Sequence, residues 1–169
     1  MSETEQLAAL ARLHDRFEER GIDYWLFGGW AVDFHVGALT RSHEDLDIAV
    51  WLTDRPAIAG LLAGEGWQHT PSAGEEDYKD GYTTYAQGSV RLDLAFLARG
   101  ESGMVYTLLR AGRASWPAGA FGNDVSELRG ARARIVTLGA LRADKSELHD
   151  DPAVNAKDRA DLASLARLG

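Results

Sequence analysis

The segment from Phe27 to Val50 restricts what this chain can fold into more than any other stretch of the sequence. It begins with a glycine pair, Gly28-Gly29, after an apolar run, and it ends with Asp45 and Asp47 at the entrance to a second apolar run. Successive side chains of a β-strand point to opposite faces, so the two aspartates are expected to share one face above buried neighbours. Two adjacent carboxylates repel each other unless a cation lies between them, and a divalent metal with oxygen ligands meets that need. The pattern therefore predicts a metal site at the start of a strand.

A third acidic residue, Asp93, occupies a similar position later in the chain. Two apolar and aromatic runs, 82–86 and 90–97, are separated by Gln87-Gly88-Ser89, which is typical of a β-hairpin. In the second run the residues at alternate positions from 90 to 96 are apolar, which leaves Asp93 on the opposite face. We expect all three aspartates to lie on strand faces of this kind.

The rest of the sequence predicts an α+β fold. Ser2 with Glu5 three residues later forms a capping-box pattern, the apolar residues that follow have helical spacing, and Gly21 provides a stop. Further helices are expected over 30–36, 53–62 and 137–148, and strands over 22–27, 67–70 and 132–136. The stretch 99–130 has weak periodicity and is expected to be mainly loop, with a little helix or strand. These elements predict a small mixed β-sheet flanked by helices.

The C-terminus is expected to be helical as well. Asn155 can cap this last helix, and the apolar side of the helix is predicted to consist of Ala160, Leu162, Leu165 and Ala166. With 169 residues the chain fits one domain, in which 1–98 form the sheet core and 99–169 form a less regular segment and the C-terminal helices.

Composition narrows the choice of partners. The 18 basic and 26 acidic residues give a net charge of -8, which argues against nucleic-acid binding and suits a cationic small molecule better. The absence of cysteine excludes disulfides, thiolate nucleophiles and cysteine metal sites. The acidic N-terminus lacks the apolar core of a signal peptide, and no apolar run approaches the roughly 20 residues that span a bilayer. We therefore expect a cytoplasmic protein without a membrane partner, as a monomer or homodimer.

The order of these motifs resembles a known superfamily. A glycine pair, a short helical segment, Asp-x-Asp on a strand and a third acid on a later strand are similar to nucleotidyltransferases of the DNA polymerase β type. More closely, Gly28-Gly29-Trp30-Ala31-Val32-Asp33 with Thr40-Arg41-x-His43-x-Asp45-x-Asp47 resembles the antibiotic nucleotidyltransferases that modify aminoglycosides at the 2″ position or modify lincosamides. The segment Lys157-Asp158-Arg159-Ala160-Asp161-Leu162 is similar to the C-terminal helix of that family.

The sequence departs from the general superfamily pattern at two places, and the first departure favours the antibiotic-modifying branch. Trp30 follows the glycine pair where the superfamily often has serine, a feature that the antibiotic-modifying branch shares. The interval from Gly29 to Asp45 is also long, and we interpret the excess as a loop that carries Thr40, Arg41 and His43. Trp30 and Asp33 themselves are expected to serve packing and local hydrogen bonding.

The resemblance implies a role for each matching residue. Asp45 and Asp47 are expected to bind Mg²⁺, and Asp93 is expected to complete the metal site and act as general base. Gly28 and Gly29 are expected to hold the triphosphate of ATP, or of another nucleoside triphosphate, through backbone amides. The implied reaction transfers a nucleoside monophosphate, AMP from ATP, to a hydroxyl of a small molecule such as an aminoglycoside or lincosamide antibiotic.

Four basic residues have both a functional and a structural interpretation. Arg41 is expected either to contact phosphate or to pair with a neighbour such as Glu44. His43 either contacts phosphate, orients Asp45 or braces the loop. Lys145 and Lys157 either reach the triphosphate or are solvated surface charges.

The sequence leaves more than one interpretation of the acceptor molecule and of the function. The acidic residues Glu75, Glu76 and Asp77 either bind a cationic antibiotic or are simply solvated. One alternative function is nucleotide transfer to a protein or tRNA, as in toxin-linked relatives. Another is a non-catalytic ligand-binding relative, whose expected mark is a missing carboxylate, and none of the three is missing here.

Overall fold

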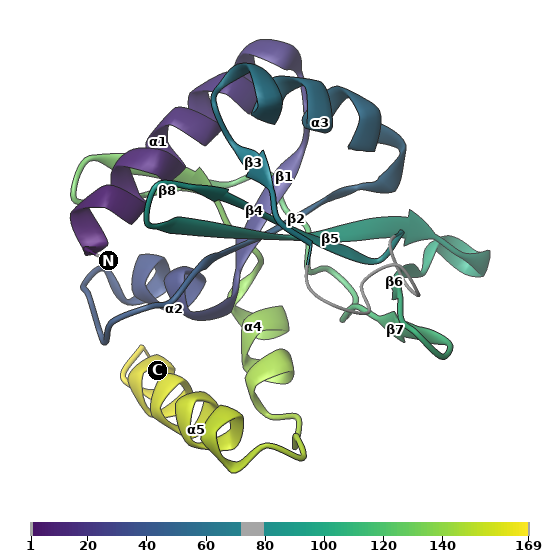
Figure 1. The fold of residues 1–169 in the computed structure, drawn as a ribbon. Coiled ribbons are helices and arrows are strands. Elements are labelled where there is room, and N and C mark those ends of the chain that lie inside the picture. The colour runs from purple at the N-terminus through teal and green to yellow at the C-terminus, as the bar shows by residue number, and fades with distance from the viewer. Residues whose placement is uncertain (1, 72–79, 169) are drawn as a thin grey trace.

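The computed structural model describes residues 2–71 and 80–168, so the acidic residues 75–77 lie outside the described residues. Figure 1 shows its helices and strands. The α-helices are α1 (Glu3–Arg20), α2 (Gly28–Val36), α3 (Arg55–Gly64), α4 (Leu138–Lys145) and α5 (Pro152–Ala166), with short 3-10 helices at Leu52–Asp54 and Glu101–Gly103. The strands are β1 (Tyr24–Phe27), β2 (Leu46–Trp51), β3 (Gln68–His69), β4 (Tyr82–Gln87), β5 (Val90–Arg99), β6 (Val105–Leu108), β7 (Arg113–Ser115), β8 (Val125–Leu128) and β9 (Ala131–Arg134).

The main sheet is mixed, as predicted. Its strand order is β1-β2-β5-β4-β3, and β6 and β7 extend it beyond the end of β5. Only one of its strand pairs, β2 with β5, is parallel among the residues that the structure describes, while β1, β3 and β4 pair antiparallel with their neighbours. The strands β8 and β9 form a separate antiparallel pair.

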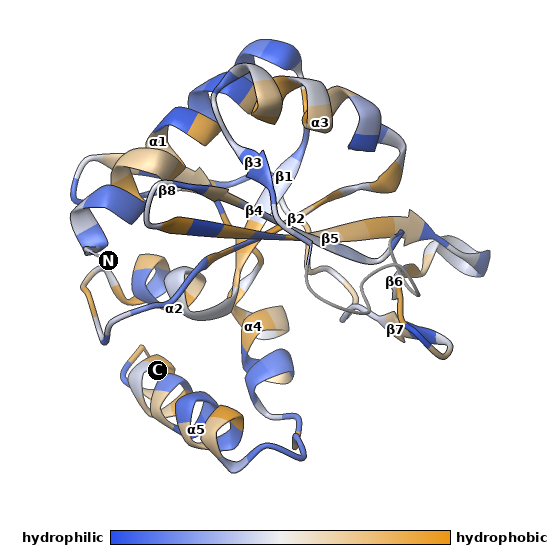
Figure 2. Cartoon of the chain, viewed as in Figure 1, coloured by the Kyte–Doolittle hydropathy of each residue, from blue (hydrophilic) through white to orange (hydrophobic). Residues whose placement is uncertain are grey.

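The helices lie on both sides of this sheet. In Figure 1, α1 and α3 cover one face, and α2, α4 and α5 lie on the other side. The residues of β2 and β5 that face α1 and α3 are almost completely buried, as the alternating pattern predicts: Leu46, Ile48, Val50, Leu92, Leu94 and Phe96. Figure 2 shows the matching hydrophobic colouring along β5. The burial of this one face fixes which way the aspartates of both strands point.

The first helix follows the predicted signals. The Ser2 hydroxyl accepts a hydrogen bond from the backbone N–H of Glu5 at 3.2 Å. At the other end Gly21 adopts the left-handed conformation with φ 65°, and its N–H bonds the last turn of α1. Both ends of the prediction are confirmed.

The predicted start of α4 after Thr137 is confirmed, but its predicted end and the predicted start of α5 are wrong. α4 ends at Lys145 rather than at 148, because Ser146 closes its last turn through a hydrogen bond from its hydroxyl to the carbonyl of Arg142 at 2.7 Å. α5 is capped by Asp151, which accepts from the N–H of Ala153 at 2.8 Å, with proline at the next position. An Asp-Pro pair is a strong start signal, and Asn155 lies inside the first turn instead.

The predicted buried face of α5 is only partly right: Leu165 is buried and Leu162 is half-buried, as predicted. Ala160 and Ala166 are exposed, whereas the buried positions are Asp158, Asp161 and Leu165. The two buried carboxylates pair with basic side chains of other segments, so charge pairing rather than apolar burial orients this helix.

The remaining segments agree with the prediction in outline. The stretch 99–130 contains the short strands β6, β7 and β8, the 3-10 helix at Glu101–Gly103, and otherwise turns and loops. The predicted strand over 132–136 appears as β9, which starts and ends slightly earlier. Over residues 2–71 and 80–168 no helix combines the length and the apolar content that a membrane crossing requires.

We expect Gly21→Ala and Gly60→Ala to change stability in opposite directions. A Cβ at either position meets nothing within 4 Å, so only backbone conformation and helix propensity differ. Gly21 has φ 65°, where alanine costs about 1 kcal/mol, whereas Gly60 lies in the interior of α3, where alanine gains roughly 0.5–1 kcal/mol. Urea unfolding of both variants measures this difference, and effects of the same sign contradict it.

Candidate active site

The site is built on a row of residues across four strands. Phe27 of β1 pairs with Asp47 of β2, Asp47 pairs with Asp93 of β5, and Asp93 pairs with Thr84 of β4. Residues paired across strands lie on the same face, so the carboxylates of β2 and β5 are neighbours. Asp45 lies one residue before β2, and oxygens of all three aspartates lie within 4.8 Å of one another. The structure therefore brings the three predicted carboxylates together.

Their environment disfavours three negative charges. Burial, followed by hydrogen bonding and repulsion from Asp93, raises the pKa of Asp45 to about 7. Burial, followed by repulsion from the other two aspartates, raises the pKa of Asp47 well above its ordinary value. A divalent cation reverses this effect, because it favours the ionised form of each carboxylate. The three oxygen donors match the ligand preference of Mg²⁺.

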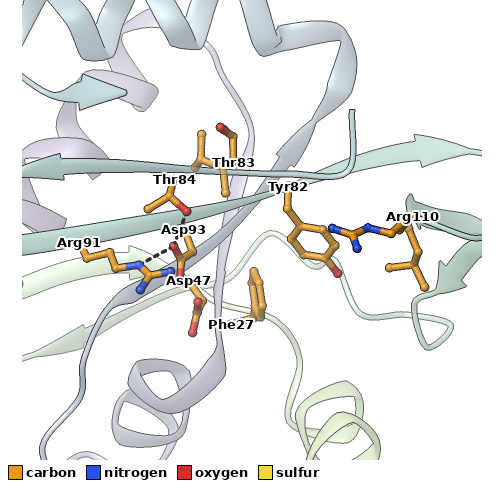
Figure 3. Close-up of a pocket in the computed structure, with 10 residues that line it drawn as sticks. Phe27, Asp47, Tyr82, Thr83, Thr84, Arg91, Asp93 and Arg110 are labelled. Carbon is orange, nitrogen blue, oxygen red and sulfur yellow. Dashed lines mark hydrogen bonds and ion pairs between the residues drawn. The ribbon is translucent and has the colours of Figure 1, made fainter. Parts of the chain in front are cut away.

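Two neighbours fix the orientation of Asp93. The hydroxyl of Thr84 donates to Asp93 Oδ1 at 3.0 Å, and Arg91 Nε donates to the same oxygen at 3.1 Å (Figure 3). Neither residue was predicted from the sequence. The hairpin register could have identified Thr84. Once a two-residue turn pairs Gln87 with Val90, the same register sets Thr84 opposite Asp93.

The glycine pair lies against the carboxylates at the start of α2. Gly28 has φ 71°, and a Cβ there would overlap the carboxylate of Asp47. At Gly29 a Cβ would lie 2.5 Å from His43 Nδ1 and 2.7 Å from Arg41 Nη2. The first N–H groups of a helix have no partner within the helix, and these close approaches leave room only for glycine.

His43 is held rigidly beside this glycine pair. Its Nε2 lies 2.6 Å from Asp33 Oδ2, and its ring lies 4.7 Å from that of Trp30. Asp33 also accepts from the backbone N–H of Thr40 at 3.1 Å. The predicted packing of Trp30 and the predicted local hydrogen bonding of Asp33 are confirmed, although Trp30 Nε1 has no hydrogen-bond partner among the described residues. His43 braces the loop through Asp33 and does not hydrogen-bond Asp45. Its Nδ1 is buried without a hydrogen-bond partner among the described residues, so the contact to phosphate stays a prediction.

The predicted basic residues are paired with acids. Arg41 forms a two-pronged ion pair with Asp161 at 2.9 and 3.0 Å, rather than with Glu44. Lys145 Nζ lies 3.0 Å from Asp161 and 3.3 Å from Asp158. The exposed Lys157 lies 3.4 Å from Glu44. The importance of Asp158 and Asp161 was missed, although their spacing to Leu165 places all three on one helix face.

Two cavities meet at Asp47. A small polar cavity of about 180 Å³ contains every predicted site residue except Asp93; it is lined by Gly28, Gly29, Arg41, His43, Glu44, Asp45, Asp47, Lys145, Val154, Lys157 and Asp158. A larger cavity of about 700 Å³ contains Asp93 and is lined also by Phe27, Asp47, Tyr82, Thr83, Thr84, Arg91, Leu94, Leu109 and Arg110 (Figure 3). The small cavity offers amides and cations to an anion, and the larger one offers aromatic and polar groups to an organic molecule.

Comparison with known proteins agrees with this arrangement. A family model described as Aminoglycoside-2''-adenylyltransferase matches residues 9–165. The 2''-aminoglycoside nucleotidyltransferase of Escherichia coli is 35% identical over 46 residues, which is 27% of this chain and 26% of that protein. The chain thus matches only about a quarter of the length of this curated relative.

Solved structures share the fold over nearly the whole chain. The lincomycin-bound lincosamide antibiotic adenylyltransferase LnuA has a TM-score of 0.71 and 19% identity, with 100% of this chain and 99% of that one covered. ANT(2")-Ia in complex with adenylyl-2"-tobramycin has a TM-score of 0.68 and 19% identity, with 98% and 87% covered. Since the family model spans all but the two ends of the sequence, the chain belongs to the aminoglycoside-2''-adenylyltransferase family.

Proposed function

We propose that this protein transfers AMP from ATP to a hydroxyl of a small molecule, an antibiotic of the aminoglycoside or lincosamide class. The observation that carries the proposal is the position of the three carboxylates where the two cavities meet. Asp47 borders both cavities, Asp45 borders the small one and Asp93 borders the large one. A reaction that joins a ligand of one cavity to a ligand of the other takes place at this boundary.

The small cavity suits the triphosphate. Gly28 and Gly29, at the start of α2, line this cavity, where free N–H groups at a helix start can bind an anion, and Lys145 and Lys157 add positive charge. His43 Nδ1, which no described residue satisfies, offers a further contact beside Gly29. Bound Mg²⁺ would neutralise charge on the phosphates and on Asp45, Asp47 and Asp93, which are the residues placed to hold it.

The large cavity suits the acceptor. The rings of Phe27 and Tyr82 face it, and such rings pack against the apolar face of a sugar (Figure 3). Asp93 lies in the same cavity with its orientation fixed by Thr84 and Arg91. In the proposed step the acceptor oxygen bonds to the α-phosphorus of ATP, the bond to pyrophosphate breaks, and Asp93 takes the hydroxyl proton.

The relatives indicate the class of acceptor. One is named for aminoglycosides, and the solved structures hold lincomycin and an adenylylated tobramycin. Both kinds of molecule carry sugar hydroxyls, so we propose an acceptor of this type for the present chain.

We expect Asp93→Asn to lower turnover by at least about 10²-fold, because a general base contributes typically that much or more. The measurement incubates purified protein with Mg²⁺, each nucleoside triphosphate and a panel of aminoglycosides and lincosamides, and follows the mass of the acceptor. The wild-type product should be heavier by one AMP.

A matched control for this substitution is Asp23→Asn. Asp23 forms an ion pair with Arg134 at 2.8 Å and borders neither cavity, so its variant should retain activity. Undiminished turnover by Asp93→Asn would exclude Asp93 as the base. If the wild-type protein modifies no member of the panel and instead labels protein or tRNA in a lysate, the acceptor is a macromolecule and not a small molecule.

We expect Mg²⁺ to stabilise the protein more at pH 8 than at pH 5. The raised pKa values of Asp45 and Asp47 mean that the folded metal-free protein keeps protons that the unfolded chain releases near about pH 4. These two groups therefore make the folded state less stable as pH rises from about 4 through 7. Because Mg²⁺ binds the ionised carboxylates, it offsets this loss mainly at the higher pH.

Thermal unfolding with and without Mg²⁺ at both pH values measures this effect. Asp45→Asn removes the carboxylate with a pKa of about 7 and should reduce the difference between the two pH values. An equal Mg²⁺ stabilisation at pH 5 and pH 8 would show that these carboxylates do not bind the ion.

A further inference from the structure

The C-terminal helix α5 presents an acidic face to the rest of the protein. The side chain of Asp161 is 1% exposed and that of Asp158 is 9% exposed, and both lie on the same face as the buried Leu165. Burying carboxylates costs more than burying leucine unless strong partners compensate for the lost hydration. The partners of these carboxylates therefore explain why this face is acidic.

Asp161 joins two cations from distant parts of the chain. Both of its oxygens accept from Arg41, which lies 120 residues earlier, and Oδ2 also lies 3.0 Å from Lys145 Nζ. Burial by itself would raise the pKa of Asp161, but the hydrogen bonds from Arg41 and Lys145 outweigh it and lower the pKa. Asp161 is thus a fixed negative charge that holds two positive groups in place.

Lys145 keeps one donor for the small cavity. An ammonium group has three N–H donors, and Asp161 and Asp158 account for two of them. Within residues 2–71 and 80–168 no further hydrogen bond or ion pair of Lys145 uses the third. The side chain of Lys145 lines the small cavity together with Gly28 and Asp47, so the remaining donor is available to a ligand there.

We propose that α5 completes the nucleotide site and that Asp161 is a positioning residue, which orients Lys145 and Arg41 toward the triphosphate. This inference rests on the proposed function of the small cavity. A free lysine or arginine side chain loses rotamer freedom when it is immobilised on binding. Asp161 holds both side chains before the nucleotide arrives, which lowers the cost of ordering them on binding.

The test is Asp161→Asn, which keeps the size of the side chain but removes its charge and one of its two acceptors. Calorimetry measures binding of the Mg²⁺ complex of α,β-methylene-ATP, an analogue that cannot transfer AMP, in the absence of acceptor. We expect the Kd of Asp161→Asn to rise about tenfold. In turnover assays the KM for ATP should rise similarly, while the KM for the acceptor should stay within about twofold of wild type.

Two further variants separate positioning from simple stability. Leu165 lies one turn further along the same face, and Leu165→Ala removes apolar packing but leaves the carboxylates that contact Lys145 and Arg41. It should lower the melting temperature but leave the Kd of the analogue unchanged. Asp158→Asn removes the longer of the two contacts to Lys145 and should raise the Kd by about threefold, which provides a test even where Asp161→Asn does not fold.

The outcomes are distinct. A folded Asp161→Asn or Asp158→Asn variant that binds the analogue like wild type overturns the inference and leaves the proposed function intact. A Kd that rises equally in Leu165→Ala also overturns it, because docking of α5 alone would then explain the effect. If the wild-type protein does not bind the analogue, the assignment of the small cavity to the nucleotide fails, and the inference fails with it.

Discussion

The parallel pairing of β2 with β5 is the interaction on which the rest of the site depends. Its register sets Asp47 beside Asp93, and the apolar residues on the opposite face of both strands hold that register. A shift by one residue would turn the aspartates into the core beside α1 and α3 and the leucines toward the opposite face of the sheet. The burial of one face of the sheet therefore determines the position of the carboxylates on the other.

The same arrangement concentrates negative charge, and the structure compensates for it nearby. Asp45 and Asp47 have raised pKa values because protein surrounds them and they repel each other and Asp93. On the far side of the small cavity lie Lys145 and Arg41, which are themselves held by acidic residues of α5. The small cavity is therefore lined by Asp45 and Asp47 and by basic side chains that acidic residues of α5 hold in place.

The C-terminal helix shows where periodicity alone fails. The spacing of alanine and leucine in α5 predicts an apolar buried side. Charged residues are seldom buried unless they are paired, but here Asp158 and Asp161 are paired and occupy the buried side with Leu165. The buried face consists of Asp158, Asp161 and Leu165 because Lys145 and Arg41 approach from other segments. No local signal in the helix reveals that those cations are present.

The sequence by itself determined the local elements and the identity of the three carboxylates. The capping box of α1, the alternation in β2 and β5, and the hairpin of β4 and β5 depend on a few neighbouring residues, so the sequence predicts them directly. The structure shortened the predicted hairpin connection by one residue, because Gln87 pairs with Val90. Only the tertiary structure decided how distant segments meet. Arg41 with Asp161, His43 with Asp33, and the division of the site into two cavities at Asp47 depend on how the helices pack against the sheet. Sequence spacing does not encode such contacts, because they join residues up to 120 positions apart through packing that no single segment specifies.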